Sequence, residues 1–425
     1  MASLVRWVVV ALVLVHGLIH LLGAAKGFGW AEVAVLEQPV GPVGGVAWLV
    51  AAVLVAAAAA VMAAGLRWWW VAAATAAVVS QAVILTSWSD ARWGTIANIV
   101  VLLAAGYGFA SVGPASLEVE WQQRADSAFD ESTGAAAPVT EADLARLPEP
   151  VAAYARSSGA LGKPHVSSFY AAIHGRIRGG TDQPWMPFTG KQFNSYGASP
   201  QRLFFIDASM RGLPVDVLHV FGDGAATMRA RVASVVTIVD SAGAEVDRAE
   251  TVTIFNDLVV LAPAALVDAP IRWSPIDGRR VRGTFTNGSQ SASAELVFDA
   301  DHKLLDFISD DRLRASADGT SFTVQRWSTP IYAYAQLHGR RVAVTGEGRW
   351  HAPAPEGEFA YLEFNVDDLV YNARPDWGQD HEKTRHRVRR AAMSTQTQPQ
   401  QAPAADAEPA TALPGNPGGP IGGSP

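Results

Sequence analysis

The chain has 425 residues, of which 49% are hydrophobic, and a formal net charge of −7. The negative charge, with basic residues scattered outside the C-terminal tail, argues against a nucleic-acid-binding surface. The absence of cysteine excludes disulfides, thiol catalysis and cysteine-based metal sites, and it fits either redox compartment.

The first 113 residues contain four apolar stretches, each close to the roughly 20 residues that a helix needs to cross a bilayer. The first is too long for a cleaved signal peptide and further spans follow it. Tryptophans lie mostly near the ends, where their rings favour the headgroup region. We therefore predict a multi-pass protein of the cell (plasma or inner) membrane, surrounded by membrane lipids, with a four-helix transmembrane domain at residues 1–113. The four stretches cover residues 4–22, 43–64, 68–86 and 96–112.

The charges of the connecting loops leave the side of the soluble domain open. The positive-inside rule sets Arg6, Arg67 and Arg124 on one side against Lys26 and Arg92 on the other. Taken literally, the rule places both termini in the cytoplasm. A difference of three against two does not settle the orientation.

Two histidines interrupt the first apolar stretch. His16 and His20 are four residues apart, about 40° around a helix, so both rings can face one ligand inside the bilayer. Ionisable groups within a membrane are functional candidates by default. Two histidines alone do not define a haem or metal site, however. We therefore expect no cofactor and favour hydrogen bonds from His16 and His20 to neighbouring helices.

The membrane segment is followed by a change of composition. Residues 114–139 are charged or small, so we interpret them as a linker. Thr140 is a candidate N-cap with Asp143 three residues later, and apolar residues then recur at helical spacing. Pro148 and Pro150 favour a division into two short helices. The soluble domain is predicted to cover residues 140–373.

Beyond Pro164 the apolar residues alternate with polar ones, which is typical of half-buried strands. Gly222-Asp223-Gly224 and Asn287-Gly288 have the composition of hairpin turns. Between Ala249 and Val267 a spacing of three and four predicts a single amphipathic helix. We therefore predict a mainly antiparallel β domain, a curved sheet or half-barrel packed against one amphipathic helix. The clearest alternating stretches are 169–177, 203–208, 228–232, 292–298 and 360–366.

Residues 374–425 form a tail that is predicted to be disordered, because it is basic at first and then rich in Gln, Pro, Ala and Gly. Its basic run at 381–390 would attract anionic lipid at about 1 kcal/mol per residue if it lay at a cytoplasmic surface. The alternative is a solvated cluster that keeps the tail extended.

Several short motifs, together with their order along the chain, resemble those of a bacterial domain family of unknown function. The resemblance covers about residues 145–372, and several family members have a similar multi-helix membrane segment in front. It implies no activity, because none is assigned to the family. At the level of the fold, the domain is similar to the half-barrels of bacterial lipoprotein carriers, which hold acyl chains. The motifs are LPEPV (147–151), PWMPF (184–188), ETVTIFND (250–257), FTN (285–287), SDDR (309–312), WSTP (327–330) and YN (371–372).

Catalytic signatures are absent from the sequence. It has no G-x-S-x-G elbow, no phosphate loop and no dinucleotide fingerprint. His381 and His386 are five residues apart, about 140° around a helix, which does not match the zinc-protease spacing. A hydrolase that brings together distant Ser, His and Asp residues stays open as an alternative.

An apolar cluster flanked by prolines, Trp185, Met186 and Phe188, suits the mouth of a curved sheet that binds an acyl chain. The predicted helix could cover such a cavity, with polar groups that orient a headgroup. The alternatives are ordinary core packing and hydrogen bonds to nearby groups. The candidate ligand-binding residues are Trp185, Met186, Phe188, Phe255, Asn256, Asp257, Trp327 and Tyr334.

We therefore predict a membrane-anchored protein whose curved β domain binds or transfers a hydrophobic or lipid-like molecule without covalent chemistry. One alternative is a scaffold with a fully packed sheet and an unidentified protein partner. The other is an unrecognised hydrolase. A cavity of ligand size separates the first two hypotheses, whereas a buried titratable cluster with perturbed pKa values would favour the hydrolase.

Overall fold

The computed structural model describes residues 2–132, 137–316 and 321–375, so the predicted disordered tail lies outside the described residues from 376 onward. Among those described, four helices are long and apolar enough to span a membrane. Large apolar side chains such as Leu12, Ile19 and Leu103 are exposed on them, as lipid-facing residues are. The helices are α1 (Ala2–Gly27), α2 (Pro42–Ala63), α3 (Trp69–Thr86) and α5 (Gly94–Val112), with the short α4 (Trp88–Ala91) between the last two.

The segment predicted as a linker contains a helix, α6 (Leu117–Glu131). Ser116 caps it by accepting a hydrogen bond from the backbone of Val119. Trp121, Ala125 and Ala128 are buried at a spacing of four and three. The interpretation of residues 114–139 as a tether was therefore wrong for this part, because one face of α6 packs against the domain that follows.

Two short helices then precede the sheet, as the prolines predict. They are α7 (Glu141–Leu144) and α8 (Glu149–Ser157). Thr140 and Asp143 form a complete capping box at the start of α7, which confirms the predicted N-cap.

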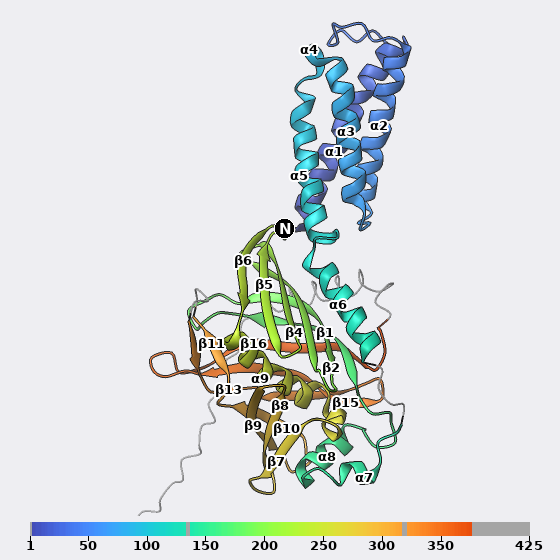
Figure 1. Cartoon of the computed structure of the whole chain (residues 1–425). Helices are drawn as coiled ribbons and strands as arrows, with labels where there is room; N and C mark the ends of the chain where they lie inside the picture. Colours follow the sequence, from blue (N-terminus) through green and yellow to red (C-terminus); the bar gives the residue numbers. More distant parts are fainter. Residues whose placement is uncertain (1, 133–136, 317–320, 376–425) are drawn as a thin grey trace, which may run out of the picture. The chain divides into compact units, whose positions relative to one another are not determined.

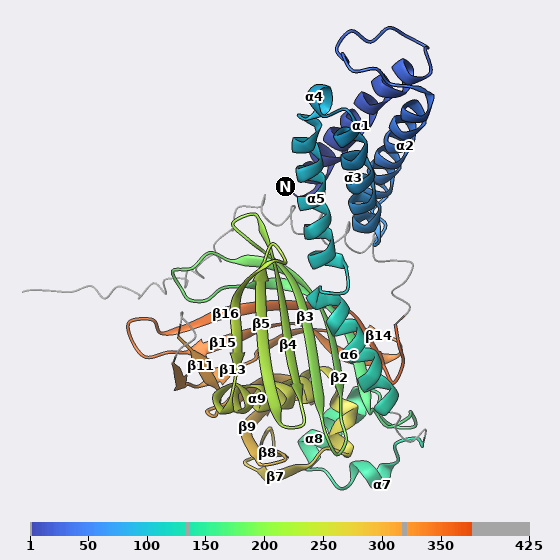
Figure 2. The same cartoon turned by 45° about the horizontal axis from the view of Figure 1, so that its top comes forward.

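Fourteen strands in the described residues form one curved, antiparallel and unclosed sheet (Figures 1 and 2). Its order is β6-β5-β4-β3-β2-β1-β16-β15-β13-β10-β9-β8-β7, and β14 pairs with β15. The half-barrel prediction is confirmed. The first strands are β1 (Ser168–Ile177), β2 (Met186–Ser195), β3 (Gln201–Met210), β4 (Leu213–Gly222), β5 (Ala225–Val232) and β6 (Val236–Ala242).

The remaining strands follow the long helix of the domain. A separate two-stranded sheet contains β11 (Leu313–Ala315) and β12 (Phe322–Val324). The others are β7 (Ile271–Pro275), β8 (Arg280–Asn287), β9 (Gln290–Phe298), β10 (Leu304–Ser309), β13 (Trp327–Ser328), β14 (Ile331–Leu337), β15 (Arg340–His351) and β16 (Glu358–Tyr371).

Helix α9 (Ala244–Leu261) connects the two edge strands, β6 and β7, and lies in the concave face of the sheet (Figure 2). A 3-10 helix, η1 (Pro263–Val267), follows it, because Pro263 cannot donate to the helix ladder. Every residue of α9 from Ala249 onward is buried. The predicted helix packed against the curved sheet is confirmed, although α9 ends at Leu261 before Pro263 and is buried along its second half rather than on one face only.

The two faces of β3 show how the sheet separates α9 from α6. Arg202 and Phe204 point to the concave face, whereas Leu203 and Phe205 point to the convex face. On the convex side, the indole Nε1 of Trp121 donates to the backbone oxygen of Leu203 at 3.1 Å. The domain therefore has three layers, with α6 outside, the sheet in the middle and α9 inside.

Candidate functional site

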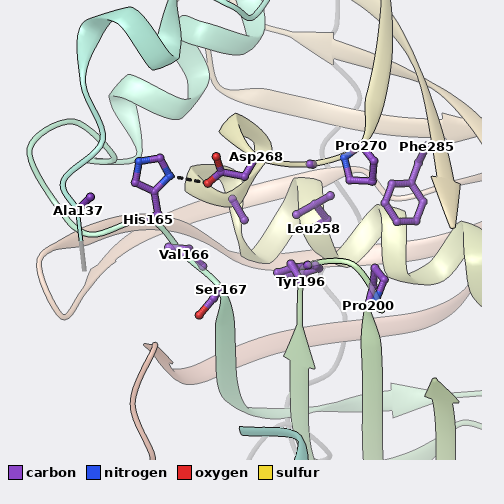
Figure 3. A pocket seen from close by; sticks show the side chains of 13 residues that line it. Ala137, His165, Val166, Ser167, Tyr196, Pro200, Leu258, Asp268, Pro270 and Phe285 are labelled. Atoms are coloured by element: carbon purple, nitrogen blue, oxygen red, sulfur yellow. Dashed lines mark hydrogen bonds and ion pairs between the residues drawn. The ribbon is translucent and has the colours of Figure 1, made fainter. Parts of the chain in front are cut away.

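A pocket of about 320 Å³ lies where the concave face meets the end of α9 (Figure 3). Its volume is at the lower end of the range for small-molecule sites. Most of its wall is apolar. The lining residues come from the segment before β1 (Ala137, His165, Val166, Ser167), the β2–β3 turn (Tyr196, Gly197, Pro200), α9 and the segment after it (Leu258, Ala265, Asp268, Ala269, Pro270), and β8 (Phe285).

One side of the pocket carries a polar pair. His165 Nδ1 lies 2.5 Å from an Asp268 carboxylate oxygen, and His165 Nε2 lies 3.8 Å from Asp143. Ser167 also lines the pocket, but its hydroxyl bonds to the side chain of Asn372 and points away from His165 in Figure 3. These three residues therefore do not form a nucleophile, base and acid arrangement.

Phe255 and Asp257, two of the three predicted residues on α9, lie directly behind the pocket wall. The ring of Phe255 stacks on that of Phe285, with centroids 5.5 Å apart. Asp257 accepts a hydrogen bond from Asn194, whose amide also lies 3.4 Å from the hydroxyl of Tyr196. Phe285 and Tyr196 line the pocket, so α9 supports the wall through its aromatic and polar contacts.

Arg202 is the centre of a buried ion-pair network between α9 and the sheet. Its Nε lies 2.7 Å from Asp257 and its Nη1 lies 3.0 Å from Glu250. Asp257 also accepts a hydrogen bond from Gln192 at 2.6 Å. Arg312 approaches Glu250 at 3.8 Å. Because the two arginines face two carboxylates, the charges balance inside the domain.

Burial and neighbouring charges shift the pKa values of Glu250 and of His219, whose Nδ1 lies 3.8 Å from Glu250. Burial alone would raise the pKa of Glu250, but the charges of Arg202, His219 and Arg312 outweigh burial and hold it below its ordinary value. Burial lowers the pKa of His219 to about 4, so its imidazole is neutral at neutral pH. A perturbed cluster of this kind was our criterion for the hydrolase alternative. Structural ion-pair networks shift pKa values in the same way, however, and these groups contact one another.

The predicted aromatic cluster of the PWMPF motif is divided between two environments. Trp185 is half-buried and lies against the guanidinium groups of Arg176 and Arg178, 4.6 and 4.4 Å from its ring centroid. Met186 begins β2 and is also half-buried, whereas Phe188 is in the core. None of the three is among the residues that line the pocket. Ligand contact at these residues stays a prediction.

The other three predicted residues are held by the fold outside the pocket. Asn256 donates to the hydroxyl of Thr329 at 3.0 Å. Trp327 packs edge-on against Phe307 with centroids 6.1 Å apart. The hydroxyl of Tyr334 donates to the backbone oxygen of Leu304. The pocket is built instead by residues such as His165, Tyr196 and Asp268, which the sequence motifs missed because no local pattern connects them.

A second arrangement bears on the hydrolase alternative. The hydroxyl of Ser328 lies 2.9 Å from Nε2 of His351, and Nδ1 of His351 lies 3.3 Å from Glu358. The order of groups is that of a serine nucleophile with its base and acid. Ser328 is only 1% exposed, however, so its hydroxyl is closed to a substrate carbonyl in this arrangement.

In the membrane segment, His16 and His20 take part in a buried hydrogen-bond network between three helices. Nε2 of both rings lies within 3.1 Å of the hydroxyl of Ser80, and that of His16 also lies 3.0 Å from Asn98. These contacts are the interhelical hydrogen bonds that the sequence favours, and cofactor binding stays untested. Within the described residues, no group of three or more His, Asp or Glu side chains has the arrangement of a metal site.

Comparison with known proteins gives a family and several distant solved structures. The profile of a family of unknown function (DUF6544) matches residues 137–364, more than half of the chain. No curated protein matches the sequence. Among solved structures, a domain assigned to outer membrane lipoprotein sorting in Vibrio parahaemolyticus is 12% identical, with a TM-score of 0.29, and covers 51% of this chain and 91% of that one.

Two further structures match at similar distance. A DUF1329 family protein from Desulfovibrio piger is 10% identical, with a TM-score of 0.32, over 58% of this chain and 99% of that one. A LolA superfamily protein from Nitrosomonas europaea is 10% identical, with a TM-score of 0.29, over 54% of this chain and 94% of that one. The predicted resemblance to a family of unknown function is thereby confirmed.

Proposed function

This chain belongs to a family of unknown function (DUF6544), and we propose that its β domain binds an apolar ligand of about one acyl chain in the pocket beside α9. The observation that carries the proposal is the apolar pocket of about 320 Å³ in the concave face. A fully packed sheet, as the scaffold hypothesis requires, would leave no such space. Lipids of the surrounding membrane are the nearest source of such a ligand.

The volume and the lining restrict the ligand. A pocket of this size suits one chain or a comparably small apolar molecule better than a lipid with several chains. Val166, Leu258 and Phe285 supply buried apolar wall. His165 and Asp268 supply hydrogen-bonding groups for a polar end of the ligand. Nothing in this arrangement requires a covalent step, so the proposal is for a membrane-anchored carrier.

Equilibrium binding to the full chain in nanodiscs tests the proposal. The probe is a fluorescent fatty acid, whose signal is measured with the wild type and with an Ala269→Trp variant. Ala269 lines the pocket and is only half-buried, so the larger ring enters the pocket while the fold persists. We expect at least a tenfold weaker affinity, about 1.4 kcal/mol, for this variant.

The matched control is Ala198→Trp. Ala198 is exposed, belongs to the same β2–β3 turn as Tyr196, and does not line the pocket. It should bind the probe as the wild type does. Equal binding by all three proteins would show that the probe partitions into lipid or binds elsewhere, and it would remove the proposed function.

A further inference from the structure

One end of the sheet exposes large apolar side chains. At the β3–β4 and β5–β6 turns and along the edge strand β6, four large apolar residues are between 50 and 60% exposed. Soluble surfaces seldom gather such residues without a partner, and an unpaired edge strand adds to the hazard of aggregation. We name this surface the apolar tip, and it consists of Leu213, Val235, Val236 and Ile238.

The apolar tip lies close to the point where the chain leaves the last membrane span. Arg231, four residues before Val235, donates to the backbone oxygen of Ala115 at 3.0 Å. Ala115 is three residues after Val112, the end of α5. Three residues reach at most about 10 Å. The contact therefore holds the β5–β6 hairpin near the boundary of the span.

The direction of α6 shows that the tip points back toward the span. The start of α6 contacts the middle of the strands, where Glu118 pairs with Lys191. Its last residue, Glu131, lies 3.3 Å from Gln201 at the other end of β3. Since α6 leads away from α5, the β3–β4 turn beyond Met210 lies on the side of α5. The tip thus extends past the start of α6 toward the membrane.

The pocket opens at the opposite end of the same strands. Tyr196 and Pro200, which line it, belong to the β2–β3 turn, whereas the tip includes the β3–β4 turn. Strand β3 has ten residues, so the two turns are about 33 Å apart. The tip is therefore a separate surface from the pocket, and the following inference is independent of the proposed function.

We propose that the apolar tip inserts into the headgroup and upper acyl region of the same bilayer that α5 crosses. The chemistry of the tip suits the membrane interface. Its apolar side chains lie beside the exposed Arg211 and the half-buried Arg231, and interfacial membrane-binding surfaces combine the same two kinds of residue. The exposed apolar stretch of β6 ends at Ile238, and Asp240 follows it. Insertion would hold the domain at a second point besides the covalent link through residues 113–116.

Because the natural chain has no cysteine, single introduced cysteines give a direct test. The full chain carries Val235→Cys labelled with an environment-sensitive fluorophore, in nanodiscs with or without lipids that bear a spin label near the headgroup. We expect blue-shifted emission that the spin-labelled lipid quenches several-fold. The matched control is Leu161→Cys, which is also an exposed apolar residue but lies beside Val139 at the pocket end. Its label should stay in water and unquenched.

A second variant distinguishes insertion from pairing of the edge strand with another copy of the chain. Adding Ile238→Asp to the Val235→Cys protein should lower the quenching several-fold without changing the melting temperature, because Ile238 is exposed in the fold. Equal, weak quenching at positions 235 and 161 would overturn the proposal. It would also be overturned if the label at 235 responded only to protein concentration, since the edge strand would then pair with a second copy.

Discussion

The two faces of the β-sheet carry similar ion pairs in different surroundings. On the convex face, Arg229 pairs with Glu120 of α6, and about a quarter of each side chain is exposed. On the concave face, Arg202 pairs with Asp257 and Glu250 of α9, and no more than 11% of any of these side chains is exposed. Water screens the first pair and not the second. Removing one partner of an ion pair should therefore cost more folding free energy on the concave face than on the convex face.

The largest expected effect is on the concave face. Arg202→Met leaves the buried Asp257 without its cation and Glu250 with Arg312 alone at 3.8 Å, and we expect it to lower the free energy of unfolding by about 3–5 kcal/mol. Arg229→Met is the matched change on the convex face and should cost about 1 kcal/mol or less. Denaturant unfolding of the β domain within the full chain measures both. Similar costs for the two variants would contradict the contrast between the faces.

Asp306 extends the comparison to a half-buried acid, one of whose carboxylate oxygens has no hydrogen-bond partner among the described residues. It points to the face opposite Phe307, and burial raises its pKa to about 7. Because the folded protein holds the proton more tightly than the unfolded chain, stability should fall as the pH rises from about 4 through 7. Asp306→Asn should reduce this dependence and raise the melting temperature at pH 8, while the part that comes from Asp216, whose pKa burial raises to about 6, remains. Thermal melts of the wild type and the variant between pH 5 and 8 test this prediction. If the two proteins have the same dependence of melting temperature on pH, Asp306 is not buried as described.

The apolar pocket on the concave face should respond to the length of its ligand. Each added methylene contributes about 0.8 kcal/mol, which is about a fourfold change in Kd. We expect this increment in a series of fatty acids until the pocket is full and the affinity reaches a plateau. A series without a plateau would indicate partition into lipid rather than binding in a pocket of limited volume.

The smallest expected effect concerns the Ser328, His351 and Glu358 arrangement, where we expect no measurable change. The buried hydroxyl of Ser328 should not react with a fluorophosphonate probe, and Ser328→Ala should leave probe labelling unchanged. Labelling of the wild type that disappears in the variant would establish an activated serine and revive the hydrolase alternative.

Much of the fold could be predicted, because it depends on local patterns. The membrane spans follow from length and apolar composition, and the strands follow from their period of two. The capping box at Thr140 and Asp143 marks α7 correctly. Helix α6 was missed because it is polar overall, although the spacing of Trp121, Ala125 and Ala128 was a signal for it.

The site could not be predicted in the same way, because distant segments build it. His165 and Asp268 are 103 residues apart, and Arg202 and Asp257 are 55 apart. No local spacing connects such pairs before the sheet curves around α9. A motif in the sequence singled out Phe255 and Asp257, and these two residues lie behind the pocket wall rather than on it.

Photo-crosslinking shows directly where an apolar ligand lies on the chain. The full chain in nanodiscs is irradiated with a diazirine-labelled fatty acid, and the modified peptides are mapped by mass spectrometry. We expect cross-links at pocket residues such as Tyr196, Leu258 and Phe285, which Ala269→Trp removes and Ala198→Trp retains. Cross-links confined to the membrane helices, with none in residues 137–375, would contradict ligand binding by the β domain.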